Sequence, residues 1–195
     1  MRKRDLKRFF VELSKEWKHP AAILLIGGGG ALVMGGVRPT LDVDFEVKFR
    51  SKASSWDGFQ EAVRRVSAKT GIGAQYAESI ERWSEITLLD YRKHSKLVGV
   101  FGSIQVRVLE PEYWSIGKVA RYWDQDIQDM LAVFKRQKPD SLRLANVWAA
   151  AIAKSPKSTQ LALARRQALH FFQTHGKKIW GNSFDFKGVE RLFSR

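Results

Sequence analysis

The stretch that most constrains the fold is residues 26–47, which read IGGGGALVMGGVRPTLDVDFEV. It opens on four consecutive glycines and closes on three carboxylates that alternate with apolar residues, namely Asp42, Asp44 and Glu46. Alternation with a period of two is typical of a β-strand and predicts that the three carboxylates share one face. Like charges on one strand face repel each other, and a divalent cation relieves that repulsion. We therefore expect a strand that presents carboxylates to a metal ion.

The glycines that precede this strand allow backbone N–H groups to approach an anion closely. Mg²⁺ prefers oxygen ligands and is usually bound by one or two carboxylates together with substrate phosphates and water. A phosphate cradle beside such a metal site is the equipment of phosphoryl or nucleotidyl transfer. The glycine run is not a P-loop, because no Gly-Lys-Ser/Thr sequence follows it.

Periodicity along the chain predicts an α/β (α+β) fold, in which a small mixed sheet flanked by helices is followed by a helical C-terminal half. The expected strands cover residues 21–26, 41–49, 85–91, 97–101 and 103–109. The expected helices cover residues 5–17, 31–34, 59–68, 113–135 (as one helix or two), 141–154 and 159–174. Residues 75–84 fit no single element, and the tail 176–195 has no clear period. The predicted division is a core over residues 1–111 and a helical region over residues 112–195.

The net charge of +14 is concentrated at the two ends of the chain. Residues 1–20 hold seven basic and three acidic side chains, and residues 141–195 hold ten basic and two acidic ones. Basic ends attract polyanions such as nucleic acid, although charge alone does not specify a ligand. The sequence has no apolar run of membrane-spanning length and no signal peptide. The absence of cysteine fits a reducing cytoplasm, so we expect a cytoplasmic protein with no membrane partner.

The joint pattern resembles the nucleotidyltransferase superfamily (polymerase-β-like fold), and more closely its bacterial branch that includes the abortive-infection AbiEii-type toxins. The resemblance lies in a glycine pair followed by an RxTxDxD strand, formed here by Gly28, Gly29, Arg38, Thr40, Asp42 and Asp44. It implies that the two aspartates hold Mg²⁺ or Mn²⁺ and that the glycine pair cradles the phosphates of a nucleoside triphosphate. Arg38 and Thr40 either contact a phosphate or hold the turn.

A weaker part of the resemblance covers residues 104–131, where a strand and a proline turn precede a helix. Lys118, Arg121, Asp126 and Asp129 match the order of lysine, arginine and acidic pair in that branch. The resemblance implies that Lys118 lies near the nucleotide phosphates and that Arg121 binds the nucleotide. The alternative is a solvated helix with ordinary ion pairs.

The sequence departs from the superfamily at one position. A third carboxylate normally faces the DxD pair from a later strand, and Arg107 lies near the expected place. Glu46 and Glu110 are the candidates to substitute for it. In two-metal transfer the third acid helps to activate the attacking hydroxyl.

The resemblance therefore implies a metal-dependent nucleotidyltransferase that moves a nucleoside monophosphate to an acceptor hydroxyl. The implied acceptors are RNA, such as tRNA, and a protein side chain, and the basic ends favour RNA. By analogy with the toxins, the chain would belong to a toxin-antitoxin pair and have an antitoxin protein as partner. The alternative is a non-catalytic nucleic-acid or protein-binding module on a degenerate transferase scaffold.

Overall fold

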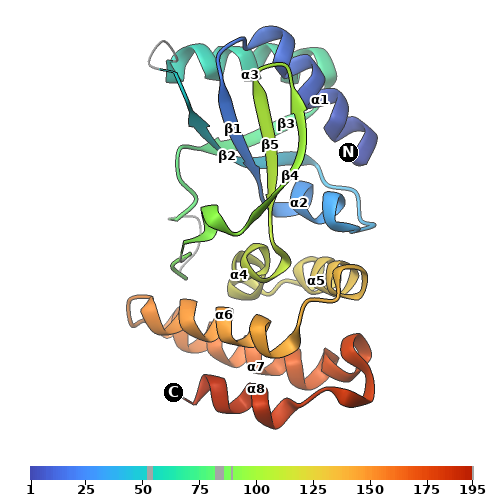
Figure 1. The fold of residues 1–195 in the computed structure, drawn as a ribbon, viewed down its shortest axis with the longest axis vertical. Helices are drawn as coiled ribbons and strands as arrows, with labels where there is room; N and C mark the ends of the chain where they lie inside the picture. The colour runs from blue at the N-terminus through green and yellow to red at the C-terminus, as the bar shows by residue number, and fades with distance from the viewer. Residues whose placement is uncertain (52–54, 82–85, 89, 195) are drawn as a thin grey trace. The chain divides into compact units, whose positions relative to one another are not determined.

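A computed structural model describes residues 1–51, 55–81, 86–88 and 90–194 of the chain. The fold is a mixed α+β architecture with one mixed sheet, which confirms the predicted fold class (Figure 1). The chain forms two compact units. Unit 1 comprises Met1–Val33, Arg38–Ile80 and Ser95–Leu109, and unit 2 comprises Met34–Val37, Glu81–His94 and Glu110–Arg195.

Unit 1 contains a five-stranded sheet with the strand order β3-β2-β1-β5-β4. Its strands are β1 (Ala21–Leu25), β2 (Asp42–Phe49), β3 (Gly73–Ala77), β4 (Ser95–Phe101) and β5 (Ile104–Leu109). β1 pairs antiparallel with β2 and parallel with β5, while β2 pairs parallel with β3 and β4 pairs antiparallel with β5. In this register Leu24 lies opposite both Glu46 and Arg107, so these three residues form one row on one face.

Helices α1 (Lys3–Glu16) and α3 (Trp56–Thr70) cover the apolar face of the sheet (Figure 1). Val43, Phe45 and Val47 of β2 are buried on this face. The rings of Phe10 from α1 and Phe59 from α3 each lie 6.3 Å from the ring of Phe45. Because side chains alternate along a strand, the carboxylates between these apolar residues project from the opposite face.

Unit 2 is mainly helical and comprises α4 (Pro111–Arg121), α5 (Asp124–Gln137), α6 (Ser141–Lys154), α7 (Thr159–Trp180) and α8 (Phe186–Phe193). The region predicted as one helix or two forms two, because Tyr122 adopts φ 57° and ends α4. The tail without a clear period is helical: α7 extends through Trp180, and α8 follows. Phe134, Trp148 and Phe171 are buried and pack together in the core of the unit.

The strand predicted over residues 85–91 is not found in the described part of that segment. Residues 86–88 are not in a strand, and Tyr91–Lys93 form a 3₁₀ helix, while residues 85 and 89 lie outside the described residues. The backbone N–H of Thr87 donates to Ser155 Oγ at the end of α6, over 2.7 Å. The segment therefore bonds to a helix end within unit 2, which apolar periodicity alone cannot reveal. Among the residues that the structure describes, no helix is both long and apolar enough to cross a membrane.

Candidate functional site

Asp42 and Asp44 lie on the polar face of β2 and are both partly exposed. Gln75 of β3 lies opposite Asp44 in the parallel pairing of the two strands. Its Nε2 donates a hydrogen bond of 2.7 Å to Oδ2 of Asp42. A side chain level with Asp44 thus reaches Asp42, so both carboxylates project from the same face. This is the arrangement expected from a period of two.

The glycine run forms the first turn of helix α2 (Gly27–Met34), whereas the sequence predicted a turn followed by a helix from residue 31. The N–H of Gly30 donates to the carbonyl of Ile26 over 2.8 Å, which closes that turn. Glycine has a weak helix propensity, and here the tertiary setting overrides it. The backbone N–H of Ile26 also donates to the carbonyl of Asp44, over 3.0 Å, and ties the start of the helix to β2.

Gly27 and Gly28 lie so close to neighbouring side chains that neither position has room for a Cβ. A Cβ on Gly27 would lie 1.9 Å from Oδ2 of Asp44, and the φ of Gly27 is +52°. A Cβ on Gly28 would lie 2.5 Å from Oγ1 of Thr40. By contrast, a Cβ on Gly29 would meet only apolar atoms, at 3.7 Å or more. Gly29 therefore faces the core, and Gly27 and Gly28 face the polar side chains of the candidate site.

The start of α2 is electrostatically suited to anions. The first N–H groups of a helix have no acceptor within the helix, and the helix dipole adds a partial positive charge there. Phosphates bind readily at such positions. In this structure the carboxylate of Asp44 itself lies against Gly27 at the helix start.

Arg38 and Thr40 make contacts within the loop between α2 and β2. Thr40 is buried, and its Oγ1 donates to the carbonyl of Asp42 over 3.4 Å. Nη1 of Arg38 donates to the carbonyl of Pro39 over 3.3 Å. These contacts fit the interpretation in which Thr40 holds the turn.

Arg107, which lies near the place predicted for a third carboxylate, is on the polar face of the sheet. Arg107 shares the row of Glu46, and it donates from Nε and Nη2 to Oγ and the carbonyl of Ser95, over 2.9 and 2.6 Å. Glu46 is on the predicted face but is only 3% exposed, and its Oε2 accepts the N–H of Ile80 over 3.1 Å. Arg107 is a cation, and the carboxylate of Glu46 is buried, so neither residue supplies an accessible third carboxylate next to Asp42 and Asp44.

Glu110 lies beyond the sheet, at the N-cap of α4 in unit 2, where its Oε2 accepts from Nη2 of Arg143 over 2.7 Å. Across the described ranges, no three or more His, Asp or Glu side chains are grouped to hold a metal ion. Asp42 and Asp44 are therefore a pair of candidate ligands rather than a complete protein-only metal site. That set suits an ion that brings phosphate and water ligands with it, rather than an ion held by protein alone.

In unit 2 the structure brings together Lys118, Arg121, Asp126 and Asp129. Nζ of Lys118 lies 2.9 Å from Asp126 Oδ1 and 2.8 Å from Asp129 Oδ2. Arg121 donates to both oxygens of Asp126, over 2.7 and 2.6 Å. These ion pairs join α4 to α5.

Three members of the cluster are buried, with Lys118 4% exposed and both aspartates less than that, whereas Arg121 is exposed. Burial by itself raises the pKa of Asp126, but the hydrogen bonds from Arg121 and the charge of Lys118 outweigh it, so the pKa lies below the ordinary value of 3.8. The ammonium of Lys118 is already shared by two carboxylates. One of its three N–H donors is left, but its charge is already balanced by these carboxylates and the side chain is buried.

Two residues of the candidate site, Gly27 and Gln75, were not singled out from the sequence. Gly27 could have been found, because it directly follows the strand predicted over residues 21–26 and is the first glycine of the run. Gln75 gave no signal, since its role depends on β3 pairing with β2 across 33 residues of sequence.

The chain was compared with models of protein families, with curated proteins and with solved structures, and none of them matches it. The resemblance to nucleotidyltransferases therefore rests on the sequence motifs alone.

Proposed function

We propose that the protein is a metal-dependent nucleotidyltransferase that moves a nucleoside monophosphate from a nucleoside triphosphate to an acceptor hydroxyl. The observation that supports this proposal most is the placement of Asp42 and Asp44 on one face of β2, with Asp44 against the glycine start of α2. Paired carboxylates beside a helix N-terminus combine the two groups that a metal-bound triphosphate needs.

Asp42 and Asp44 would hold Mg²⁺ or Mn²⁺, and the ion would supply charge neutralisation for the triphosphate. Gln75 would orient Asp42, because its amide donates to one carboxylate oxygen and leaves the other available. The missing side chains of Gly27 and Gly28 let Asp44 and Thr40 lie against the start of α2. The carboxylate that would hold the metal ion is thereby next to the helix N–H groups that would meet the phosphates.

In the proposed reaction the acceptor oxygen bonds to the α-phosphorus, the bond from that phosphorus to the bridging oxygen breaks, and pyrophosphate leaves. The hydroxyl proton would pass to solvent, because Arg107 lies near the place where the resemblance predicts a third acid. A missing general base costs typically about 10²–10⁴-fold in rate, so we expect slow transfer.

RNA, such as tRNA, is the acceptor that the charge of the chain favours over a protein side chain. Ten of the 55 residues in 141–195 are basic and two are acidic, and the N-terminal twenty residues are also basic. A role as the toxin of a toxin-antitoxin pair is part of the proposal only by analogy with the AbiEii-type branch.

The proposal is tested by incubating the protein with each α-labelled nucleoside triphosphate, Mg²⁺ or Mn²⁺, and total tRNA. We expect label on RNA with the wild type and none with Asp44→Asn. Asp57→Asn is the matched control, because Asp57 lies in the first turn of α3 rather than on the polar face of β2. The proposal fails if no label is transferred, or if Asp44→Asn transfers as much label as the control variant.

A second candidate function is favoured by Arg107, which replaces a carboxylate by a cation on the same face. It is a non-catalytic module that binds nucleic acid or protein on a degenerate transferase scaffold. Under this alternative, no label is transferred. RNA binding measured by filter retention is then the same for the wild type and for the double variant that carries both Asp42→Asn and Asp44→Asn.

A further inference from the structure

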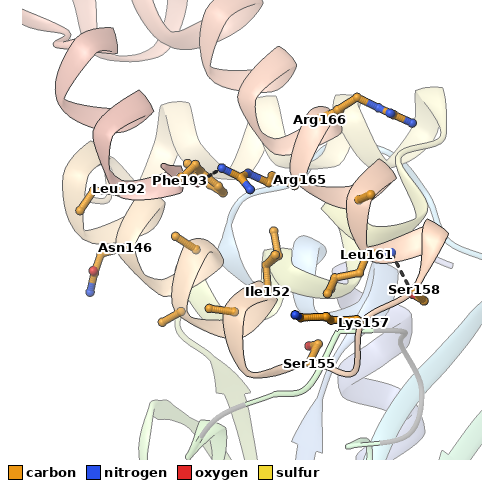
Figure 2. A pocket seen from close by; sticks show the side chains of 14 residues that line it. Asn146, Ile152, Ser155, Lys157, Ser158, Leu161, Arg165, Arg166, Leu192 and Phe193 are labelled. Atoms are coloured by element: carbon orange, nitrogen blue, oxygen red, sulfur yellow. Dashed lines mark hydrogen bonds between the residues drawn. The ribbon is translucent and has the colours of Figure 1, made fainter. Parts of the chain in front are cut away.

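A groove of about 760 Å³ lies on unit 2 between α6 and α7, next to the end of α8 (Figure 2). Short and apolar side chains dominate its lining, among them Ala149, Ala150, Ala153, Leu161 and Ala162. On each helix the lining residues recur at three- and four-residue intervals, which marks one continuous stripe along the helix. The groove therefore runs along the two helices.

Helix α8 already occupies part of the same surface. A Cβ on its Gly188 would lie 3.1 Å from Cδ2 of Leu142, one turn before the groove on α6. The ring of Phe193 packs against Phe172 of α7, and its carbonyl accepts from Nη2 of Arg165. Where α8 ends, the stripe of small residues on α6 and α7 continues, so the groove is the extension of a surface that already accepts a helix.

The rim of the groove is cationic and includes Lys157, Arg165 and Arg166. Figure 2 shows Lys157 beside Ser155 and Arg165 beside Phe193. Asp185 and Glu190 are the only acidic residues of the sequence from position 141 onward, and neither lines the groove. Within the part of the chain that the structure describes, Lys157 and Arg166 form no ion pair with an acidic side chain.

We propose that this groove binds an acidic amphipathic helix of a partner protein. An alanine floor lets a second helix approach closely, and leucine-sized side chains at helical spacing would fill the space between α6 and α7. Carboxylates flanking that apolar stripe would meet the three cations of the rim. The phosphates of a nucleic-acid backbone could pair with the cations of the rim, but they would provide no apolar group to pack against the alanine floor. Phe193, the aromatic residue of the lining, is buried and offers no stacking surface.

The test uses the full chain and a fluorescein-labelled synthetic helix with leucines on one stripe, glutamates on both flanks and alanines elsewhere. We expect saturable binding by fluorescence anisotropy. Ala153→Trp, which fills the groove from an exposed position, should weaken it about tenfold or more, as should Lys157→Glu combined with Arg166→Glu. Lys177→Glu combined with Lys178→Glu is the matched control, because both lysines lie in the last turn of α7 and neither lines the groove.

Circular dichroism of each variant confirms that the fold is retained. The proposal is overturned if the peptide does not bind, if a scrambled peptide of the same composition binds equally, or if the control variant weakens binding as much as the groove variants. It is also overturned if single-stranded RNA binds in place of the peptide with the same dependence on Ala153→Trp, since the groove would then accept nucleic acid.

Discussion

Replacing Lys118 by methionine removes the cation that two buried carboxylates share. The ammonium lies 2.9 Å from Asp126 and 2.8 Å from Asp129, and the side chain is 4% exposed. Removing one partner of a buried ion pair costs about 3–5 kcal/mol. Methionine keeps most of the apolar stem, and Arg121 still pairs with Asp126, so we expect the lower end, about 3 kcal/mol. For a chain of this length that loss lowers Tm by roughly 6–12 °C.

The assay is urea unfolding followed by circular dichroism at about pH 7, with Lys118→Met combined with Asp129→Asn as the second variant. In Lys118→Met the buried carboxylate of Asp129 has lost its lysine partner. The double variant also removes the charge of that carboxylate. It should therefore be more stable than Lys118→Met alone.

The pH dependence has a definite sign. The pKa of Asp126 is lowered in the folded state by Arg121 and Lys118, despite burial, so this carboxylate stabilises the fold above its ordinary pKa of 3.8. That contribution is lost as the pH falls through the folded pKa. The difference in unfolding free energy between the wild type and Lys118→Met should therefore shrink below about pH 4. A loss of less than about 1 kcal/mol at neutral pH, or a difference that stays constant down to about pH 3, would refute the argument.

Two further substitutions test the packing around the site and the core of unit 2. Gly27→Ala should lower the unfolding free energy by about 1–3 kcal/mol, because residue 27 has a positive φ. The new Cβ would also displace the carboxylate of Asp44, so Mn²⁺ binding measured by electron paramagnetic resonance should be weaker. Wild-type Mn²⁺ affinity in this variant would contradict the placement of Asp44. Ser115→Ala should cost about 1–3 kcal/mol in thermal unfolding, because Nε1 of buried Trp148 donates to Ser115 Oγ over 2.9 Å. An unchanged Tm would mean that another acceptor serves the indole.

Local periodicity was enough to predict the α+β fold class. The alternation around Val43 and Phe45 predicted both the strand and the shared face of its carboxylates, because a pleated strand sends successive side chains to opposite sides. The helix expected to end near Lys154 was confirmed, although its N-cap is Asp140 rather than the predicted Ser141. Where the signal was mixed, as over residues 85–91 and in the tail, the predictions were wrong or left open.

What the sequence determined by itself is the pattern within single elements: which residues alternate, which recur every three or four positions, and where charge accumulates. What only the tertiary structure decided is which elements meet. It placed Gln75 beside Asp42, set Arg107 in the row of Glu46, and closed Lys118 into a buried cluster. These contacts depend on strand order, strand register and helix packing between segments far apart in the chain, and no local spacing encodes those distances.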